Sequence, residues 1–118
     1  MTTHSFRAGE DLSDHSYYLV RIDEQGSVVR ANGGAAIGTL LSPVHEGGVA
    51  SVASLDENFL AVANSPINIG DYVRLAGNSC GRVLGDDKIE KDKRYLGQAL
   101  SKAAGKGSTV TVVPCRLT

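Results

Sequence analysis

The chain is poor in cysteine, since only Cys80 and Cys115 occur among 118 residues. They stand far apart, without a Cys-x-x-Cys pair and without a histidine at the spacing of zinc ligands. The sequence therefore indicates neither a disulfide framework nor a zinc site. We expect a reduced pair with at least one thiol buried. The alternative is a disulfide that joins two strands.

Long apolar runs are also absent. No stretch approaches the roughly 20 residues that span a bilayer, and the N-terminal MTTHSFRAGED lacks the apolar core of a signal peptide. We therefore predict no membrane partner. The protein is expected to be made and kept in the cytosol, unless it leaves as part of a larger particle.

Neither sign of charge is in large excess, because the formal net charge is −1. Without a basic surplus interleaved with stacking aromatic residues, the sequence does not predict direct binding to nucleic acid. The charge is nevertheless uneven: Met1–Leu84 holds five basic and nine acidic residues, while Gly85–Thr118 holds seven basic and four acidic ones. Such polarity is either ordinary surface scatter or a means of orienting the protein on a partner.

What the sequence does contain is an internal repeat. The stretch Ala36–Leu55, AIGTLLSPVHEGGVASVASL, returns in altered form as Tyr95–Val113, YLGQALSKAAGKGSTVTVV. Each copy is typical of a strand, a glycine turn and a second strand, which indicates a supersecondary unit used twice. The matched segments are Ile37-Gly38 with Leu96-Gly97, Leu41-Ser42 with Leu100-Ser101, Gly47-Gly48 with Gly105-Lys106-Gly107 after about one inserted residue, and Val49 and Val52 with Val110 and Val112.

Short strands bounded by turn residues continue outside the repeat. We predict an all-β fold, a small barrel- or sandwich-like domain built from two related β-hairpin units with a flexible N-terminal arm. This single domain covers residues 1–118, with the arm at 1–10 and the repeated units at about 12–55 and 67–113. Gly97–Ala104 also suits a short helix, but we favour a strand by analogy with the first copy. The further strands are Tyr17–Ile22, Val28-Val29, Phe59–Ala63, Ile69–Leu75 and Val83-Leu84, with turns at Asp23–Gly26, Ala31–Gly34 and Gly77-Asn78.

Residues capable of chemistry are scattered along the chain. Asp14-His15-Ser16 contains the three residue types of a catalytic triad, but neighbours on an extended chain point to alternate faces and cannot bond in series. His4, His15 and His45 stand in separate segments without metal-ligand spacing. Gly105–Ser108 lacks the first glycine of a phosphate loop, because that position is Leu100. We therefore predict no enzyme activity, no cofactor and no metal.

The segment Gly85–Arg94, GDDKIEKDKR, is dense in charge of both signs, with four acidic and four basic residues. We expect a solvated, mobile loop, and contact with a charged neighbour is the alternative.

The N-terminal segment Met1–Gly9 is polar, and Phe6 is its prominent apolar side chain. We expect a mobile arm here. Such an arm is either a frayed terminus or a segment that becomes ordered when Phe6 and Arg7 meet a partner surface.

Taken in order, these segments resemble the capsid cement (decoration) proteins of tailed phages. The resemblance covers nearly the whole chain. It departs from the family pattern in the charged loop Gly85–Arg94 and in the His-Ser-Tyr-Tyr stretch at His15–Tyr18. The matching segments are Ala8–Leu12, Gly26–Val29, Ala36–Leu40 and Gly47–Val52, followed by Ile69–Val73, Leu96–Leu100 and Gly107–Val113.

The resemblance implies a structural virion protein, made in the host cytoplasm, that binds the outside of an expanded icosahedral capsid and stabilises it. The implied partner is the major capsid protein, with the chain acting as a homotrimer and without direct contact to nucleic acid. We expect the N-terminal arm to face the capsid, with the residues Thr3, His4, Ser5, Phe6 and Arg7.

Two other functions stay open on the sequence alone. One is a stand-alone cytosolic β-barrel that binds a small ligand or a peptide in a defined pocket. The other is an enzyme, which would require His15 or His45 to gather with carboxylates from elsewhere in the chain.

Overall fold

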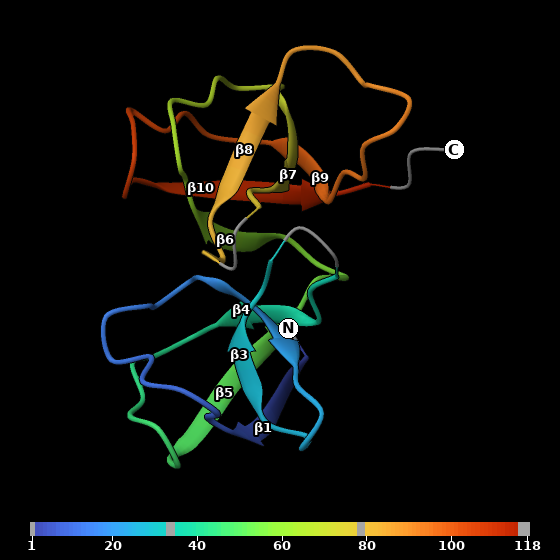
Figure 1. Cartoon of the computed structure of the whole chain (residues 1–118). Coiled ribbons are helices and arrows are strands. Elements are labelled where there is room, and N and C mark those ends of the chain that lie inside the picture. The colour runs from blue at the N-terminus through green and yellow to red at the C-terminus, as the bar shows by residue number, and fades with distance from the viewer. Residues whose placement is uncertain (1, 33–34, 78–79, 116–118) are drawn as a thin grey trace.

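The computed structural model describes residues 2–32, 35–77 and 80–115. Of the turns predicted at Ala31–Gly34 and Gly77-Asn78, the positions 33–34 and 78 lie outside the described residues. The regular elements in these ranges are strands (Figure 1). No helix in the described part of the chain is long and apolar enough to cross a membrane. The strands are β1 (Thr3–Arg7), β2 (Leu19–Ile22), β3 (Val28–Arg30), β4 (Gly38–Leu40), β5 (Val49–Ser54), β6 (Phe59–Val62), β7 (Tyr72–Leu75), β8 (Val83–Asp86), β9 (Gly97–Ala99) and β10 (Thr109–Pro114).

Two antiparallel sheets of the same topology make up the fold. The first has the order β1-β5-β4-β2-β3 and the second the order β6-β10-β9-β7-β8, so each strand of one sheet has its counterpart five strands away in the sequence. We call residues 1–58 the first unit and residues 59–118 the second unit. They form the lower and upper parts of Figure 1. The prediction of an all-β, sandwich-like fold from two related units is confirmed, and neither sheet closes into a barrel.

The register of the strands confirms most of the predicted repeat. Gly38 pairs with Ser54 and Gly97 with Pro114, so these glycines occupy equivalent positions. A Cβ atom at Gly97 would stand 2.0 Å from the carbonyl oxygen of Val113, so this close approach of strands excludes any side chain. For the segment Gly97–Ala104, where a strand was favoured over a helix, the structure has strand β9 at Gly97–Ala99 and no helix.

One matched pair of the repeat is wrong. Val52 and Val112 do occupy equivalent positions, opposite Leu40 and Ala99. Val49 lies opposite Arg7, and its counterpart opposite Val62 is Thr109 rather than Val110. A slip of one residue in a strand moves a side chain to the other face. Accordingly Val49 is 74% exposed, whereas Val110 is completely buried.

The cores of the two units are not separate. One apolar cluster fills the first unit around Leu12 and Val20, but the cluster of the second unit also takes in Leu19 and Ala31 from the first. The backbone joins the units at the same place, since the Leu19 amide donates to the Gly81 carbonyl and the Gly81 amide donates to Ala31, each at 2.9 Å. A single domain over residues 1–118 requires such a shared core. The assignment of the whole chain to one domain stays a prediction.

Cys80 and Cys115 are free thiols, as expected. Both are partly exposed, so the expectation of a buried thiol is wrong.

Candidate interaction site

The five residues predicted to face a partner, Thr3–Arg7, form strand β1 at the edge of the first sheet. β1 pairs antiparallel with β5, from Thr3 opposite Ala53 to Arg7 opposite Val49. The pairing extends beyond both ends, because the Ser54 amide donates to Thr2 and the Ala8 amide donates to Gly48, each at 2.9 Å. The predicted flexible arm is therefore wrong for these residues. The edge of β5 supplies the backbone partners that the sequence pattern did not reveal.

The outer edge of β1 presents its main chain to the surroundings. In an antiparallel pair, alternate residues direct both backbone groups toward the partner strand. The hydrogen bonds of Thr2 and Ala8 assign this role to the even-numbered residues of the strand. The N–H and C=O groups of Thr3 and Ser5 consequently point away from the sheet, which is the arrangement that accepts an additional strand. The edge is not open at the Arg7 end, because Val28 of β3 bridges to Ala8 there and its carbonyl accepts the Gly9 amide at 2.8 Å.

The side chains of β1 divide between its two faces. Phe6 is partly buried and packs against the core of the first unit, and the ring centroid of His4 lies 6.4 Å from that of Phe6. The side chains of Thr3, Ser5 and Arg7 are exposed. Phe6 thus already has an internal contact, so the groups most accessible to a partner are the outward backbone and the exposed side chains of Thr3, His4, Ser5 and Arg7. A partner-binding role for Thr3–Arg7 stays a prediction.

Strand β6 holds the corresponding place in the second unit, and its edge is contacted by the first unit. Leu60 is the counterpart of Ser5, because Leu60 lies opposite Thr111 and Ser5 opposite Ser51. The carbonyl of Leu60 accepts a hydrogen bond of 2.9 Å from the hydroxyl of Thr39, a buried residue on β4 of the first unit. Of these two equivalent edges, that of β6 is contacted by the neighbouring unit at Leu60, and that of β1 is open at Thr3 and Ser5.

The histidines are spread over different surroundings. His45 is exposed and lies 3.3 Å from Asp11. His15 stands edge-on to Tyr18, with ring centroids 4.7 Å apart, and its Nε2 lies 3.4 Å from Arg30. Burial, together with the nearby Arg30 charge, lowers the pKa of His15. Within the described ranges, no three His, Cys, Asp or Glu residues form a group that could hold a metal ion.

The charged segment after β8 is held by a polar network rather than being a loose loop. The Tyr95 hydroxyl donates to Asp86 at 2.9 Å and accepts the Glu90 amide at the same distance, and Arg74 Nε donates to Asp86 at 2.8 Å. Lys93 and Glu90 form an ion pair of 2.6 Å. The hydrogen bond from Arg74 lowers the pKa of Asp86. The mobile loop expected at Gly85–Arg94 is therefore wrong: Tyr95 anchors it.

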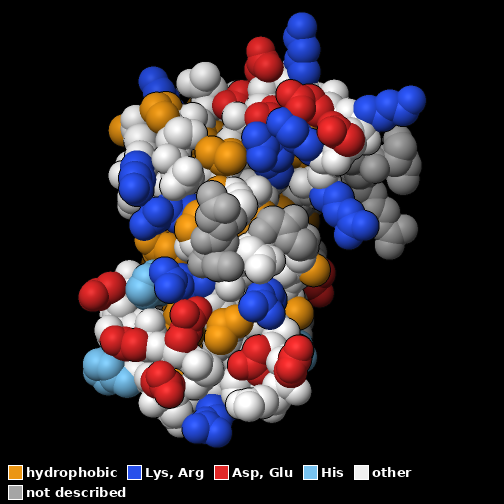
Figure 2. Space-filling model, in the orientation of Figure 1, with side chains coloured by type: hydrophobic (Ala, Val, Ile, Leu, Met, Phe, Trp, Pro, Cys, Tyr) orange, Lys and Arg blue, Asp and Glu red, His pale blue; other side chains and the backbone are white. Residues whose placement is uncertain are grey.

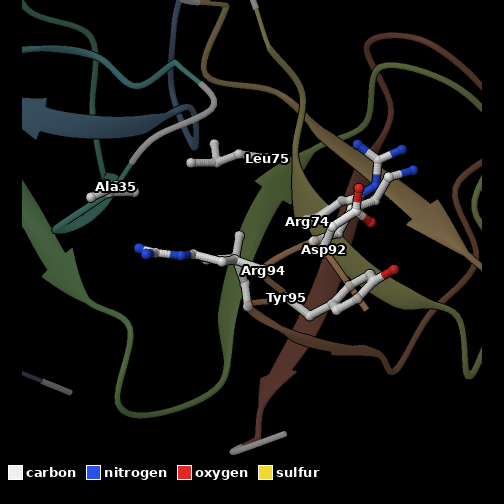
Figure 3. Close-up of a pocket in the computed structure, with 9 residues that line it drawn as sticks. Ala35, Arg74, Leu75, Asp92, Arg94 and Tyr95 are labelled. Carbon is white, nitrogen blue, oxygen red and sulfur yellow. The ribbon is translucent and has the colours of Figure 1, made fainter. Parts of the chain in front are cut away.

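A hollow of about 470 Å³ lies between this loop and the first unit (Figure 3). Arg94 extends across it toward Ala35, while the ring of Tyr95 turns the other way. Its walls mix basic, acidic and apolar groups, so the chemistry does not select one ligand class. The lining residues are Ala35, Ala36, Arg74, Leu75, Asp92, Lys93, Arg94, Tyr95 and Leu96.

A second hollow, of about 270 Å³, lies where the two units meet, and no charged residue lines it. Tyr17 stands at this groove with a φ of 67°, the one positive φ among the described non-glycine residues. Its counterpart in the second unit is Gly70, since the Tyr17 amide donates to Leu40 and the Gly70 amide to Ala99, the matching carbonyl. Sequence analysis missed this site, although its tyrosine pair was visible. The lining residues are Tyr17, Thr39, Leu41, Asn58, Phe59, Leu60 and Thr111.

Comparison with known proteins bears on the fold. No protein-family model and no curated protein matches the chain. Among solved structures, the fold is similar to the N base of head fiber gp8.5 of bacteriophage phi29, with a TM-score of 0.72 and 17% sequence identity. The superposition covers 99% of this chain and 98% of that one. At this identity the likeness is one of fold, and it extends over both units in full.

Proposed function

We propose that this protein is a structural component of a phage head. In this proposal it binds the outer surface of the expanded capsid as a homotrimer and stabilises the shell. The observation that carries the proposal is the likeness of fold to a phage head fiber base over almost the full length of both chains. The capsid cement proteins, which the sequence resembles, have the same kind of role. The protein would be made in the host cytoplasm and end on the virion surface.

The major capsid protein is the proposed partner, and β1 the proposed contact. An extended segment of the shell can pair with the outward backbone groups of Thr3 and Ser5, so that the first sheet gains a strand. Each contact needs only modest affinity, because many copies act on one shell and a trimer binds through several sites at once. Subunits that are held to their neighbours in this way resist separation under internal pressure.

The experiment that tests the function is co-sedimentation with empty shells of the major capsid protein from the same source, in unexpanded and expanded form. We expect saturable binding to expanded shells alone, because expansion creates the outer surface that is recognised. Absence of binding to either form, well above micromolar concentration, would overturn the proposal. It would leave a stand-alone module that binds a small ligand or peptide as the better interpretation.

The role of β1 is tested by the substitution Ser5→Pro. Proline removes the outward N–H of Ser5 but none of the hydrogen bonds to β5, and it is tolerated on edge strands for that reason. We expect affinity for the expanded shell to fall about tenfold, the effect of losing roughly one backbone hydrogen bond and its fit. The matched control is Ser5→Ala, which keeps the N–H and should bind as the unaltered protein does. Equal binding by both variants would remove β1 from the contact.

A further inference from the structure

An apolar surface crosses the junction of the two units. Leu60, Thr111 and Leu100 lie side by side on β6, β10 and the end of β9, because Leu60 pairs with Thr111 and the Leu100 amide donates to the Thr111 carbonyl at 2.8 Å. Leu60 is 36% and Leu100 55% exposed. Leu60 and Thr111 also line the uncharged groove with Tyr17 and Leu41. We call these five residues the waist surface.

The waist surface differs from the scattered apolar side chains elsewhere. Val49 and Ile69 are more exposed, at 74% and 69%, but each stands at a glycine turn and neither lines the uncharged groove. Single exposed apolar residues are normal on a protein surface. A contiguous group of aliphatic and aromatic side chains beside a groove is typical of a contact with another macromolecule.

The backbone of Tyr17 supports the same interpretation. The second unit places Gly70 at the equivalent position, with φ of 90°, which glycine adopts without strain. In the first unit a tyrosine takes the left-handed conformation, which is unfavourable for a side chain. Strain of this kind persists where a site requires it. Here it holds an aromatic ring at the groove, and tyrosine is enriched where protein surfaces make their strongest contacts.

The charge on either side of the waist indicates what the surface contacts. The first unit holds three basic and eight acidic residues, and the second holds nine basic and five acidic ones, so their net charges are −5 and +4. Figure 2 shows acidic side chains spread over the lower unit and most of the Lys and Arg side chains on the upper one. A second copy can therefore offer an apolar waist together with rims of complementary charge, provided that its acidic unit lies beside the basic unit of the first copy.

We infer that the waist surface is the contact between copies of this chain, with the first unit of each copy placed beside the second unit of the next. The inference rests on the homotrimer of the proposed function and makes it specific. If the long axes of neighbouring copies ran parallel, first unit would lie beside first unit and second beside second, so like charges would meet. In a closed ring of three, the long axes must instead run around the ring, so that unlike units meet at every contact.

The test is sedimentation velocity of the free protein over a range of concentration at low and high salt. We expect association at low salt that weakens as salt is raised, because exposed charges are screened. The variant Leu100→Glu should weaken association about tenfold or more, since it places a charge in the apolar contact. The matched control Ile69→Glu places the same charge on an exposed residue of the same unit and should associate like the unaltered protein. Circular dichroism checks that both variants are folded.

The outcomes separate the inferred contact between copies from the proposed function. An unaltered protein that stays monomeric at low salt, or a Leu100→Glu variant that associates like the control, would overturn the inference. Loss of shell binding by Leu100→Glu with self-association intact would show that the capsid occupies the waist surface; the inference then fails and the proposed function stands. If the protein self-associates but binds no shell, the proposed function fails and the inferred contact between copies stands.

Discussion

The two units of this protein have the same sheet, and they differ in what covers its exposed parts. Strand β6 is contacted by the first unit through the hydrogen bond from Thr39 to Leu60, whereas the edge of the equivalent β1 is open at Thr3 and Ser5. The shared features are those that a small twisted sheet needs, such as the glycine at Gly38 and Gly97. The features found in one unit alone are therefore the better guide to function.

Another pair of equivalent residues, Leu19 and Tyr72, also differs in what covers it. Leu19 of the first unit is fully buried in the core of the second. Its counterpart Tyr72 instead packs against Tyr95 of its own unit, with ring centroids 6.0 Å apart. The connection that supplies Tyr95 has ten residues, 87–96, against seven at the equivalent place in the first unit. The second unit thus covers this position with a polar segment of its own.

The largest effect is expected where the units share a core. Leu19→Ala should lower the free energy of unfolding by about 2–5 kcal/mol, because it leaves a cavity at a fully buried site. Although Leu19 belongs to the first unit, amides of β6 and β10 should lose protection against hydrogen exchange together with those of the first sheet. The matched control Leu12→Ala removes an equally buried leucine that contacts the first core alone. Unchanged protection of β6 and β10 in Leu19→Ala would show that the units unfold separately.

A smaller effect is expected at the polar cover of the second unit. Asp86→Asn weakens the charge-assisted bond from Arg74 and should cost about 1–2 kcal/mol at neutral pH. Because the pKa of Asp86 is lowered in the folded protein, its stabilisation is present above the ordinary carboxyl pKa of about 4 and is lost as the pH falls through the lowered value.

Urea denaturation at neutral and acidic pH measures this difference. The variant and the unaltered protein should differ most at neutral pH and converge in acid. The control is Asp87→Asn, at an exposed neighbour, where the change should stay within about 0.5 kcal/mol. An equal loss in both variants would mean that general surface charge, rather than the network around Tyr95, holds the loop.

The sequence predicted what local pattern and repetition determine, and missed what distant segments supply. The glycine turns and the strand at Gly97–Ala99 follow from short sequence motifs that occur twice. The pairing of Thr3–Arg7 depends on β5, more than 40 residues away, and no local pattern in a polar segment signals such a partner. The order of the charged loop likewise depends on one tyrosine at its end. Composition indicated solvation there and could not show the bonds that Tyr95 makes.

The smallest effect distinguishes the two equivalent positions Gly70 and Tyr17. Gly70→Ala should cost about 1 kcal/mol, because the backbone at φ of 90° disfavours any side chain. A Cβ atom there would meet nothing within 4 Å, so the cost is purely conformational. Tyr17→Gly relieves the same strain in the first unit and loses the partly buried ring, and the two changes should nearly cancel in thermal denaturation. If Tyr17→Gly keeps its stability but loses self-association, the ring serves the contact between copies. A loss of more than about 2 kcal/mol would instead make Tyr17 part of the packing that joins the units.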